Sequence, residues 1–431
     1  MRAKVSTVID FMKGIAARLF LRQNDTMTKR LRTLQLLIYL FIFFGFLNLA
    51  FLGKPIDPRA GVFFVVITVI VAVTSWVLKK YYPMGDRLIF LLASLLCSVG
   101  IIMLFRLDRA VAVRQLAWLV IGIVMFLFVV LYLKRGLVKY AKYRYVFLAG
   151  TILFMAMATF IGVEILGAKN WVKIGQYSFQ PSEFGKIFLI LYLSTALSNI
   201  TSRKQLIEPG IVIVAALGFM VLQRDLGTAL IIFAVAVTMV YLATSKKLYV
   251  MISLGLFSGG GLASYAVFDH IRRRFMIWLN PWDYVYNESY QLVQSMYAIA
   301  MGGLFGRGLG MGHPGYVAVN ESDFIFSVIC EEMGLLMGLA VLILHFLLFY
   351  RSIRSAIHAE NNFTKLLTAG LSVMTATQAL VIVGGVTGFI PLTGITLPFV
   401  SYGGTSLLIS FLALGIIQKV SEGDEGDTQD G

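Results

Sequence analysis

Hydrophobic residues along this chain fall into long blocks separated by short polar segments. Each block is close to the roughly 20 residues that cross the hydrocarbon of a bilayer as an α-helix. A backbone in lipid must pair its own polar groups, so these blocks should be helical, and they lack the period-2 alternation of a membrane barrel. The pattern predicts twelve membrane helices, at about 33–52, 60–78, 88–105, 115–133, 145–166, 184–200, 209–222, 226–243, 248–268, 324–350, 366–386 and 398–418.

The polar segments between these blocks differ in basic content. With the N-terminus inside, the inner segments hold about two thirds of the 37 lysines and arginines, which favours cytoplasmic placement of both termini. The net charge of +15 follows from this topology and from contact with anionic lipid head groups, so it does not require a nucleic acid partner. The composition, 58% hydrophobic and 14% charged, agrees with an all-α polytopic membrane bundle of about twelve helices.

Four regions are expected along the chain. Residues 1–32 repeat apolar positions at helical spacing beside lysines and arginines, as in a basic amphipathic helix on the inner membrane face, although a solvated leader fits as well. They have no signal-peptide pattern. Residues 33–105 are N-terminal transmembrane helices, and 106–420 form a transmembrane core with a large outer loop at 270–323. Residues 421–431 form an acidic, disordered tail.

Ionisable side chains near the outer ends of membrane helices are costly to hold there, which makes them candidates for function. In one such segment, Pro181 suits the first turn of a helix, and Glu183 would then face the positive end of that helix. Lys186 follows three residues later and would share the same helical face. The pair either serves a substrate or only neutralises two charges inside the protein.

Two further outer segments concentrate polar residues. The turn at 223–228 separates two apolar blocks and contains Asp225. The outer loop at 270–323 opens with Arg272–Arg274, against the topological trend. Guanidinium groups suit phosphate, so these arginines should contact either a diphosphate lipid head or, as an interfacial anchor, ordinary lipid phosphate.

The glycine-rich stretch at 302–315 lacks the preceding strand and the Gly-Lys-Ser/Thr of a nucleotide loop. Close packing or a flexible outer loop is the better interpretation. The histidines and cysteines show no metal-ligand spacing, so no metal ligand is assigned.

Several stretches together resemble the SEDS proteins (shape, elongation, division and sporulation), typified by RodA, FtsW and SpoVE. The resemblance covers about residues 106–419, and the ordered matches are far more specific than any single motif. The matching stretches are Asn170-Trp171, QPSE at 180–183 with Lys186, QRDLGT at 223–228, YQLVQS at 290–295, GGLFGRGLG at 302–310, SDFIFSVICEEMG at 322–334 and PLTGITLPFVSYGGTS at 391–406.

The resemblance implies a ten-helix core, to which the first two helices are an addition. It also implies a peptidoglycan glycosyltransferase that polymerises lipid II, the undecaprenyl-diphosphate-linked disaccharide-pentapeptide, in cell division, elongation or sporulation. A sugar hydroxyl then attacks an anomeric carbon and diphosphate leaves. This chemistry asks for a carboxylate to take the proton and for cations to stabilise the departing charge. Expected partners are a class B penicillin-binding protein and the division or elongation machinery, at the bacterial cytoplasmic membrane.

The chain departs from the family pattern at the expected catalytic position. The family's presumed catalytic Asp lies three residues after the Pro of an Asn/Asp-Pro pair, which corresponds here to Tyr284. We expect the neighbouring Asp283 to act as general base, with Glu288 as second choice. Arg224 also stands where the family usually has Pro, so the turn at 223–228 should be built differently.

The remaining site roles follow from the matched motifs. Glu183 and Lys186 should line a central cavity and orient substrate, while Asp225 holds either Lys186 or a divalent cation such as Mg²⁺ or Mn²⁺. No other cofactor is implied. Backbone at Ser401, Gly403 and Gly404 should approach substrate closely, or these glycines serve packing. The expected substrate-binding set comprises Gln180, Glu183, Lys186, Asp225, Arg272, Arg273, Arg274, Gln291, Asp323, Ser401, Gly403 and Gly404.

Two other classes of function stay open. A lipid II flippase would tolerate loss of Asp283 but need alternating access, for which the glycines at 259–261 could supply flexibility. A non-catalytic scaffold for a penicillin-binding protein would tolerate loss of Asp283, Glu183 or Lys186. It would instead be sensitive to changes on lipid-facing helix surfaces.

Overall fold

The computed structural model describes residues 29–52, 56–133, 136–165, 167–175, 177–286 and 289–422. Most of the predicted N-terminal amphipathic helix, most of the acidic tail and the candidate Glu288 lie outside the described residues. Two compact units make up the chain, Met1–Val69 and Ile70–Gly431. Within the first unit, the helix Lys29–Leu52 packs against the start of the next helix through the ring pairs Phe43–Phe64 and Phe46–Phe63.

The prediction of a helical membrane bundle is confirmed. Ten of the described helical segments are long and apolar enough to cross a membrane, and each of the twelve predicted blocks coincides with a helix. The remaining two, α6 and α14, are 17 residues long. The helices after Leu52 are α2 Pro58–Tyr81, α3 Arg87–Leu107, α4 Arg109–Tyr132, α5 Arg144–Ile161, α6 Pro181–Leu197, α7 Ile207–Leu222, α8 Leu226–Thr244, α9 Lys247–Val267, α10 Asp269–Leu279, α11 Tyr290–Gly302, α12 Ile325–His358, α13 Asn362–Val386 and α14 Gly404–Val420.

Short 3-10 helices join several of these elements. They are η2 Val138–Tyr143, η3 Arg203–Leu206, η4 Pro281–Tyr284 and η5 Pro314–Tyr316. Two of them, η2 and η3, lead directly into α5 and α7 and lengthen those spans.

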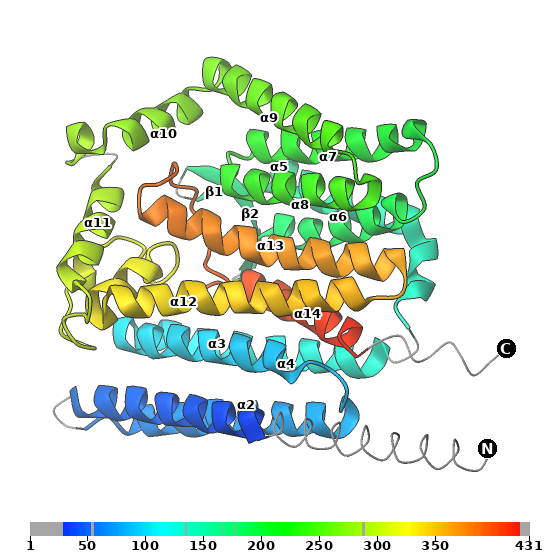
Figure 1. Cartoon of the computed structure of the whole chain (residues 1–431). Coiled ribbons are helices and arrows are strands. Elements are labelled where there is room, and N and C mark those ends of the chain that lie inside the picture. The colour runs from blue at the N-terminus through cyan, green and yellow to red at the C-terminus, as the bar shows by residue number, and fades with distance from the viewer. Residues whose placement is uncertain are drawn as a thin grey trace, which may run out of the picture. The chain divides into compact units, whose positions relative to one another are not determined.

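Close helix packing in the second unit depends on small residues at the contacts. Helix α5 packs against α6, α4 against α14, and α13 against both α12 and α8 (Figure 1). A Cβ on Gly150 of α5 would lie 2.5 Å from the ring of Phe188 on α6, and one on Gly122 of α4 would lie 2.6 Å from Phe411 on α14. Glycine therefore lets these helices approach more closely than a larger residue would allow.

A small antiparallel sheet lies between α5 and α6, where the sequence predicted helix to residue 166 and then a loop. Its strands are β1 Val163–Ile165, β2 Ala168–Ile174 and β3 Tyr177–Phe179, in the order β1-β2-β3. Helix α5 ends at Ile161 because Gly162 turns to extended backbone. The prediction of helix to residue 166 was therefore wrong. A hydropathy pattern detects long apolar runs and cannot resolve a strand as short as β1 at the end of one.

Helix α12 is broken within its apolar run. Gly334 has φ +87°, and two helical segments meet there at a kink. The segment 303–308 fills the break: the backbone N–H groups of Leu335 and Leu336 donate to the carbonyls of Gly303 and Leu304. In return, the N–H groups at positions 307 and 308 donate to the carbonyls at 331 and 332. The glycine-rich stretch thus serves close packing, one of the two alternatives that its sequence left open.

The outer elements of the second unit gather at one end of the bundle. Figure 1 shows α10 and α11 beyond the ends of α12 and α13, with the sheet at the same end. The candidate residues from the loop 270–323 and from the segments around α6 and α8 are therefore carried by elements that converge on this end.

Candidate functional site

The first part of the site is a charged pair at the start of α6. The helix begins at Pro181 with Glu183 in its first turn, as predicted. The Lys186 ammonium lies 2.8 Å from Glu183 Oε1, and the two residues are only 2% and 5% exposed. The expectation that they share one helical face is confirmed. A pair so deeply buried stabilises itself only when its other polar groups are also satisfied.

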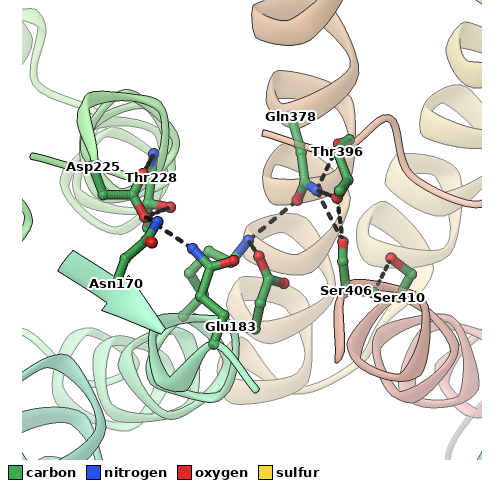
Figure 2. A network of polar contacts seen from close by, with 10 residues as sticks. Asn170, Glu183, Asp225, Thr228, Gln378, Thr396, Ser406 and Ser410 are labelled. Atoms are coloured by element: carbon green, nitrogen blue, oxygen red, sulfur yellow. Dashed lines mark hydrogen bonds and ion pairs between the residues drawn. The ribbon is translucent and has the colours of Figure 1, made fainter. Parts of the chain in front are cut away.

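Gln378 of α13 supplies that further contact. Lys186 Nζ donates to Gln378 Oε1 at 3.2 Å, and the amide nitrogen of Gln378 donates to the carbonyl of Thr396 at 3.0 Å. The hydroxyl of Thr396 in turn donates to Ser406 Oγ at 2.8 Å (Figure 2). Gln378 was not among the predicted site residues, although a lone amide within the apolar block 366–386 indicates a polar contact in the interior.

Asp225 is the centre of a second set of hydrogen bonds. It caps the N-terminus of α8: its Oδ1 accepts from the backbone N–H of Thr228 at 3.0 Å, and its Oδ2 accepts from the hydroxyl of Thr228 at 2.9 Å. The side-chain amides of Gln180 and Asn170 donate to the same Oδ2 at 2.9 and 3.2 Å. Figure 2 shows this set beside the pair on α6.

The two sets are neighbours, but their charged residues do not bind each other. Lys186 bonds to Glu183 and Gln378, while both carboxylate oxygens of Asp225 are occupied by neutral donors. The described partners of Asp225 therefore do not include Lys186, one of the two roles expected for it. Nor do the described ranges contain a group of three or more His, Cys, Asp or Glu residues placed to hold a metal ion.

The turn before α8 brings Arg224 to the surface in an unusual conformation. Its φ is +60°, which a proline could not adopt, because the proline ring holds φ near −65°. This geometry supports the expectation that the turn departs from the family's Pro-containing form. The exposed guanidinium pairs with Glu164 of β1 at 3.3 Å and also donates to the carbonyl of Gly167.

The three arginines of α10 have different surroundings. Arg272 is exposed: it lies 3.9 Å from Asp269 and donates to the carbonyl of Ala266. Arg273 is exposed beside a cleft at the junction of α9 and α10. Arg274 points inward, and its burial lowers the pKa of its guanidinium, an effect that the charge of Asp225 opposes. The expected head-group arginines are thus brought to the same end of the molecule as the Asp225 network.

The candidate general base lies on η4, within the loop that follows α10. Asp283 is exposed, and its side chain makes no hydrogen bond or ion pair with any residue that the structure describes. Tyr284 is half-buried, and its backbone carbonyl accepts from the N–H of Ser289. Gln291 lies part-buried in the first turn of α11. A free carboxylate is available for proton transfer at Asp283, whereas Tyr284 is anchored by its backbone.

Asp323 and Ser401 belong to one loop-to-loop contact. The Ser401 hydroxyl donates to the carbonyl of Ser322 at 2.6 Å and accepts from the N–H of Leu397 at 2.8 Å. Ser322 Oγ donates to Asp323 Oδ1 at 2.9 Å. Burial raises the pKa of Asp323 to about 6. Both hydrogen-bonding directions of the Ser401 hydroxyl are therefore used within the protein.

Gly403 and Gly404 fit the packing alternative. A Cβ on Gly404 would lie 2.2 Å from the ring of Trp118, and one on Gly403 would lie 3.0 Å from the methyl group of Thr396. The close approach at these glycines is to side chains of the same chain.

Two adjacent acids of α12, which were not predicted as site residues, also make buried polar contacts. Glu332 pairs with Arg106 at 3.2 Å and accepts from the N–H of Gly310 at 2.9 Å. Glu331 accepts from the N–H of His313 at 2.8 Å and lies 3.8 Å from Arg307. Two consecutive glutamates inside the apolar block 324–350 were the available signal, because such acids are rarely buried without a partner.

The chain matches, over residues 86–425, the model of the FtsW, RodA and SpoVE family, which is described as a cell cycle protein. Peptidoglycan glycosyltransferase RodA of Mycobacterium tuberculosis (strain ATCC 25618 / H37Rv) is 36% identical over 375 residues, covering 80% of each chain. Stage V sporulation protein E of Bacillus subtilis (strain 168) is 32% identical over 362 residues, covering 80% of this chain and 98% of that one.

Solved structures with the same architecture include a chain of a peptidoglycan synthase complex that coordinates polymerization and crosslinking. That chain has a TM-score of 0.66 and 26% sequence identity, with coverage of 78% of this chain and 97% of that one. The rod shape determining protein RodA of Thermus thermophilus has a TM-score of 0.59 and 25% identity, with coverage of 78% and 96%.

Proposed function

This chain belongs to the FtsW, RodA and SpoVE family of cell cycle proteins, and we propose from that membership that it polymerises lipid II into glycan strands. It is a multi-pass membrane protein and a peptidoglycan glycosyltransferase, like the relatives it matches along most of its length. The structural observation that carries the proposal is the pair of buried polar networks around Lys186 and Asp225, which lie beside each other within the helical bundle.

Buried charge in a membrane bundle is expensive and is kept where a polar substrate or an ion must be handled. Residues of five segments build these networks: the QPSE motif with Lys186, the turn at 223–228, α13 with its following loop, Asn170 of β2 and Ser406 of α14. A polar region of this kind suits a substrate with a sugar and a diphosphate on a lipid tail.

In the proposed reaction, the 4-hydroxyl of one GlcNAc attacks the anomeric carbon of a MurNAc on a second lipid. The new C–O bond forms as the bond from that carbon to diphosphate breaks, with inversion. The hydroxyl proton passes to a carboxylate, which we assign to Asp283. The support for this assignment is that Asp283 adjoins the position at which the family has its presumed catalytic Asp and has no competing described partner.

The departing diphosphate needs positive charge close to it. The candidates are Lys186 within the buried network and the arginines of α10, of which Arg274 points inward near the charge of Asp225 and the other two are exposed. Glu183 and Gln378 hold the ammonium of Lys186 in place, so their role is to position it.

The proposed setting is the bacterial cytoplasmic membrane, with both termini inside and the Asp225 network at the outer face. The proposed partner is a class B penicillin-binding protein that cross-links the new strands. Support comes from the solved peptidoglycan synthase complex, in which a similar chain takes part in coordinated polymerization and crosslinking.

The test is polymerisation of lipid II by the purified chain, alone and with a penicillin-binding protein that is inactive in glycan polymerisation. Wild type should give glycan ladders, and Asp283→Asn should reduce the rate by at least about 100-fold if it removes the general base. Glu288→Gln tests the second candidate: loss of glycan in Glu288→Gln, with activity kept in Asp283→Asn, would assign the base to Glu288 instead.

Tyr284→Asp separates this proposal from the scaffold alternative. If wild type makes no product in any pairing while Tyr284→Asp does, the chain is a scaffold descended from an enzyme. The flippase alternative predicts that the chain moves lipid II across a vesicle membrane without making glycan. Asp283→Asn should then keep this transport activity.

A further inference from the structure

A cleft of about 390 Å³ lies where the turn at 223–228 meets the junction of α9 and α10. Its size falls within the ordinary range for small-ligand sites. Its polar lining is predominantly basic: Arg224 from the turn and His270 and Arg273 from α10, against the single acid Asp269. None of these lining residues belongs to the Lys186 network.

Arg224 is held in the cleft by a backbone conformation that is costly for a residue with a side chain. A φ of +60° outside glycine costs on the order of 1 kcal/mol. Its ion pair with Glu164 joins two exposed side chains, which are 44% and 58% accessible, and such pairs add little stability. The ion pair alone therefore does not account for an arginine at this position.

Two buried nitrogen atoms next to the cleft lack hydrogen-bond partners. They are a terminal guanidinium nitrogen of Arg274 and Nε2 of His270, and neither is paired within the described residues. Buried polar atoms are normally paired, because an unpaired one costs about 1–3 kcal/mol. The charges of Arg224 and Arg274 also lower the pKa of His270, after burial itself, so these three groups share one electrostatic environment.

We propose that this cleft is a phosphate-binding site, in which Arg224 and Arg273 hold the anion and His270 and Arg274 support it from the buried side. Arginine is suited to this role, because its planar fork of donors matches the oxygens of a phosphate. An anion would provide the unpaired nitrogens with an acceptor, directly or through a bound water. It would also relieve the repulsion between cations drawn from two separate segments.

Two sources could supply such a group at this depth: the diphosphate of a polyprenyl lipid or the phosphate of an ordinary phospholipid. The first source rests on the proposed function, since that reaction uses two diphosphate-linked lipids at once and needs more than one place for a diphosphate. The cleft is separate from Lys186, so it can hold the diphosphate of one of the two lipids.

The experiment measures binding by the full chain in detergent, without turnover, using isothermal titration calorimetry. The probes are farnesyl diphosphate, inorganic diphosphate and dihexanoyl phosphatidylglycerol. Arg224→Gln and Arg273→Gln should each weaken the preferred probe about tenfold or more, as expected for loss of a charge-assisted bond. Arg203→Gln, which removes an exposed arginine of η3, is the matched control and should bind as wild type does.

Glu164→Gln provides a second test, in which the expected result is a gain of affinity that misfolding could not produce. It removes the acid that competes for Arg224, so affinity for the anion should rise by about two- to fivefold. Arginine-dependent binding of both diphosphates, with weak binding of the phospholipid, assigns the site to polyprenyl diphosphate. Arginine-dependent binding of the phospholipid alone keeps the phosphate site and assigns it to ordinary lipid.

Binding that is unchanged in Arg224→Gln and Arg273→Gln for all three probes would overturn the site. This readout is independent of polymerisation. A wild-type chain that binds diphosphate through these arginines but makes no glycan keeps the phosphate site and refutes the polymerase. A chain that polymerises lipid II, but whose diphosphate binding does not depend on these arginines, keeps the polymerase and refutes the phosphate site.

Discussion

Lys186 of α6 donates a hydrogen bond of 3.2 Å to the side-chain oxygen of Gln378 on α13, 192 positions further along the chain. The same ammonium lies 2.8 Å from Glu183, so one buried cation connects a helix start to the middle of another helix. Lys186 contacts both of the other residues, so the effects of substituting it and either partner should not be additive.

Substitution of one member of the ion pair should be more damaging to stability than substitution of both. Lys186→Met leaves the Glu183 carboxylate buried and unpaired, which should cost about 3–5 kcal/mol in the free energy of unfolding. Adding Glu183→Gln should restore most of that loss, because the remaining side chains are neutral. Thermal unfolding in detergent measures both variants.

Polymerisation by the double variant then distinguishes two roles of the pair. If Glu183 and Lys186 only balance charge, Glu183→Gln with Lys186→Met recovers activity along with stability. We expect stability to recover and activity to stay below about 1% of wild type, because the reaction has lost a cation that stabilises developing charge by roughly 3 kcal/mol.

Asp225→Ala should weaken α8 at its N-terminus. The substitution removes the cap and leaves the amides of Gln180 and Asn170 without their acceptor, so we expect a loss of about 2 kcal/mol or more. Asp225→Asn keeps a capping oxygen and should lose about half as much. Equal stability of the alanine variant and wild type would mean that this network contributes nothing to the fold.

Asp323 should make the protein less stable as pH rises from about 4 to 6. Its pKa is about 6 in the folded chain and near 3.8 when unfolded, so the folded state binds the proton more tightly in that window. At pH 7 Asp323→Asn should therefore be more stable than wild type by about 1–3 kcal/mol and unfold at a higher temperature, whereas at pH 4 the two proteins should unfold at nearly the same temperature. A difference of the same size at both pH values would exclude this origin.

Gly334→Ala should be among the most damaging glycine substitutions in the chain. Its φ is +87°, and a Cβ would lie 2.3 Å from the carbonyl oxygen of Leu304, so strain and a backbone clash together should cost at least about 2 kcal/mol. Gly218→Ala in α7 is the matched control: nothing lies within 4 Å of its Cβ position, and the change should stabilise the helix by about 0.5–1 kcal/mol. Unfolding temperatures of the two variants in the same detergent make the comparison.

The membrane helices could be predicted because one physical requirement, an apolar length that crosses a bilayer, governs all of them. Where that requirement does not apply, the prediction had no basis. Helix α12 continues to His358, beyond the predicted end at residue 350, and Arg351 in this extension pairs with Asp86 at 2.5 Å. Strand β1 lies at the end of the predicted block 145–166, and β2, β3 and the helix α10 lie outside the apolar blocks. All of them depend on local pairing and tertiary contact.

The candidate site could be predicted where sequence spacing determines geometry. Glu183 and Lys186 meet because two residues three positions apart on a helix lie on the same face. The partner of Lys186 could not be predicted in this way, since Gln378 reaches it only through the packing of α13 on α6. For the same reason Asp225 was expected to hold Lys186 or a cation, whereas the fold gives it Gln180 and Asn170. The roles assigned to Asp283 and to the arginines of α10 stay predictions for the experiments above.

The broken helix α12 has a consequence for how substrate enters. The segment 303–308 occupies the break through four backbone hydrogen bonds, two accepted from and two donated to the helix. Swinging this segment aside would expose all four pairs, at on the order of 1 kcal/mol for each that water replaces and more for each left unpaired. The glycine-rich segment is therefore a poor gate despite its composition. We therefore expect any opening that admits a lipid-borne sugar to come from other outer elements and to leave this backbone ladder intact.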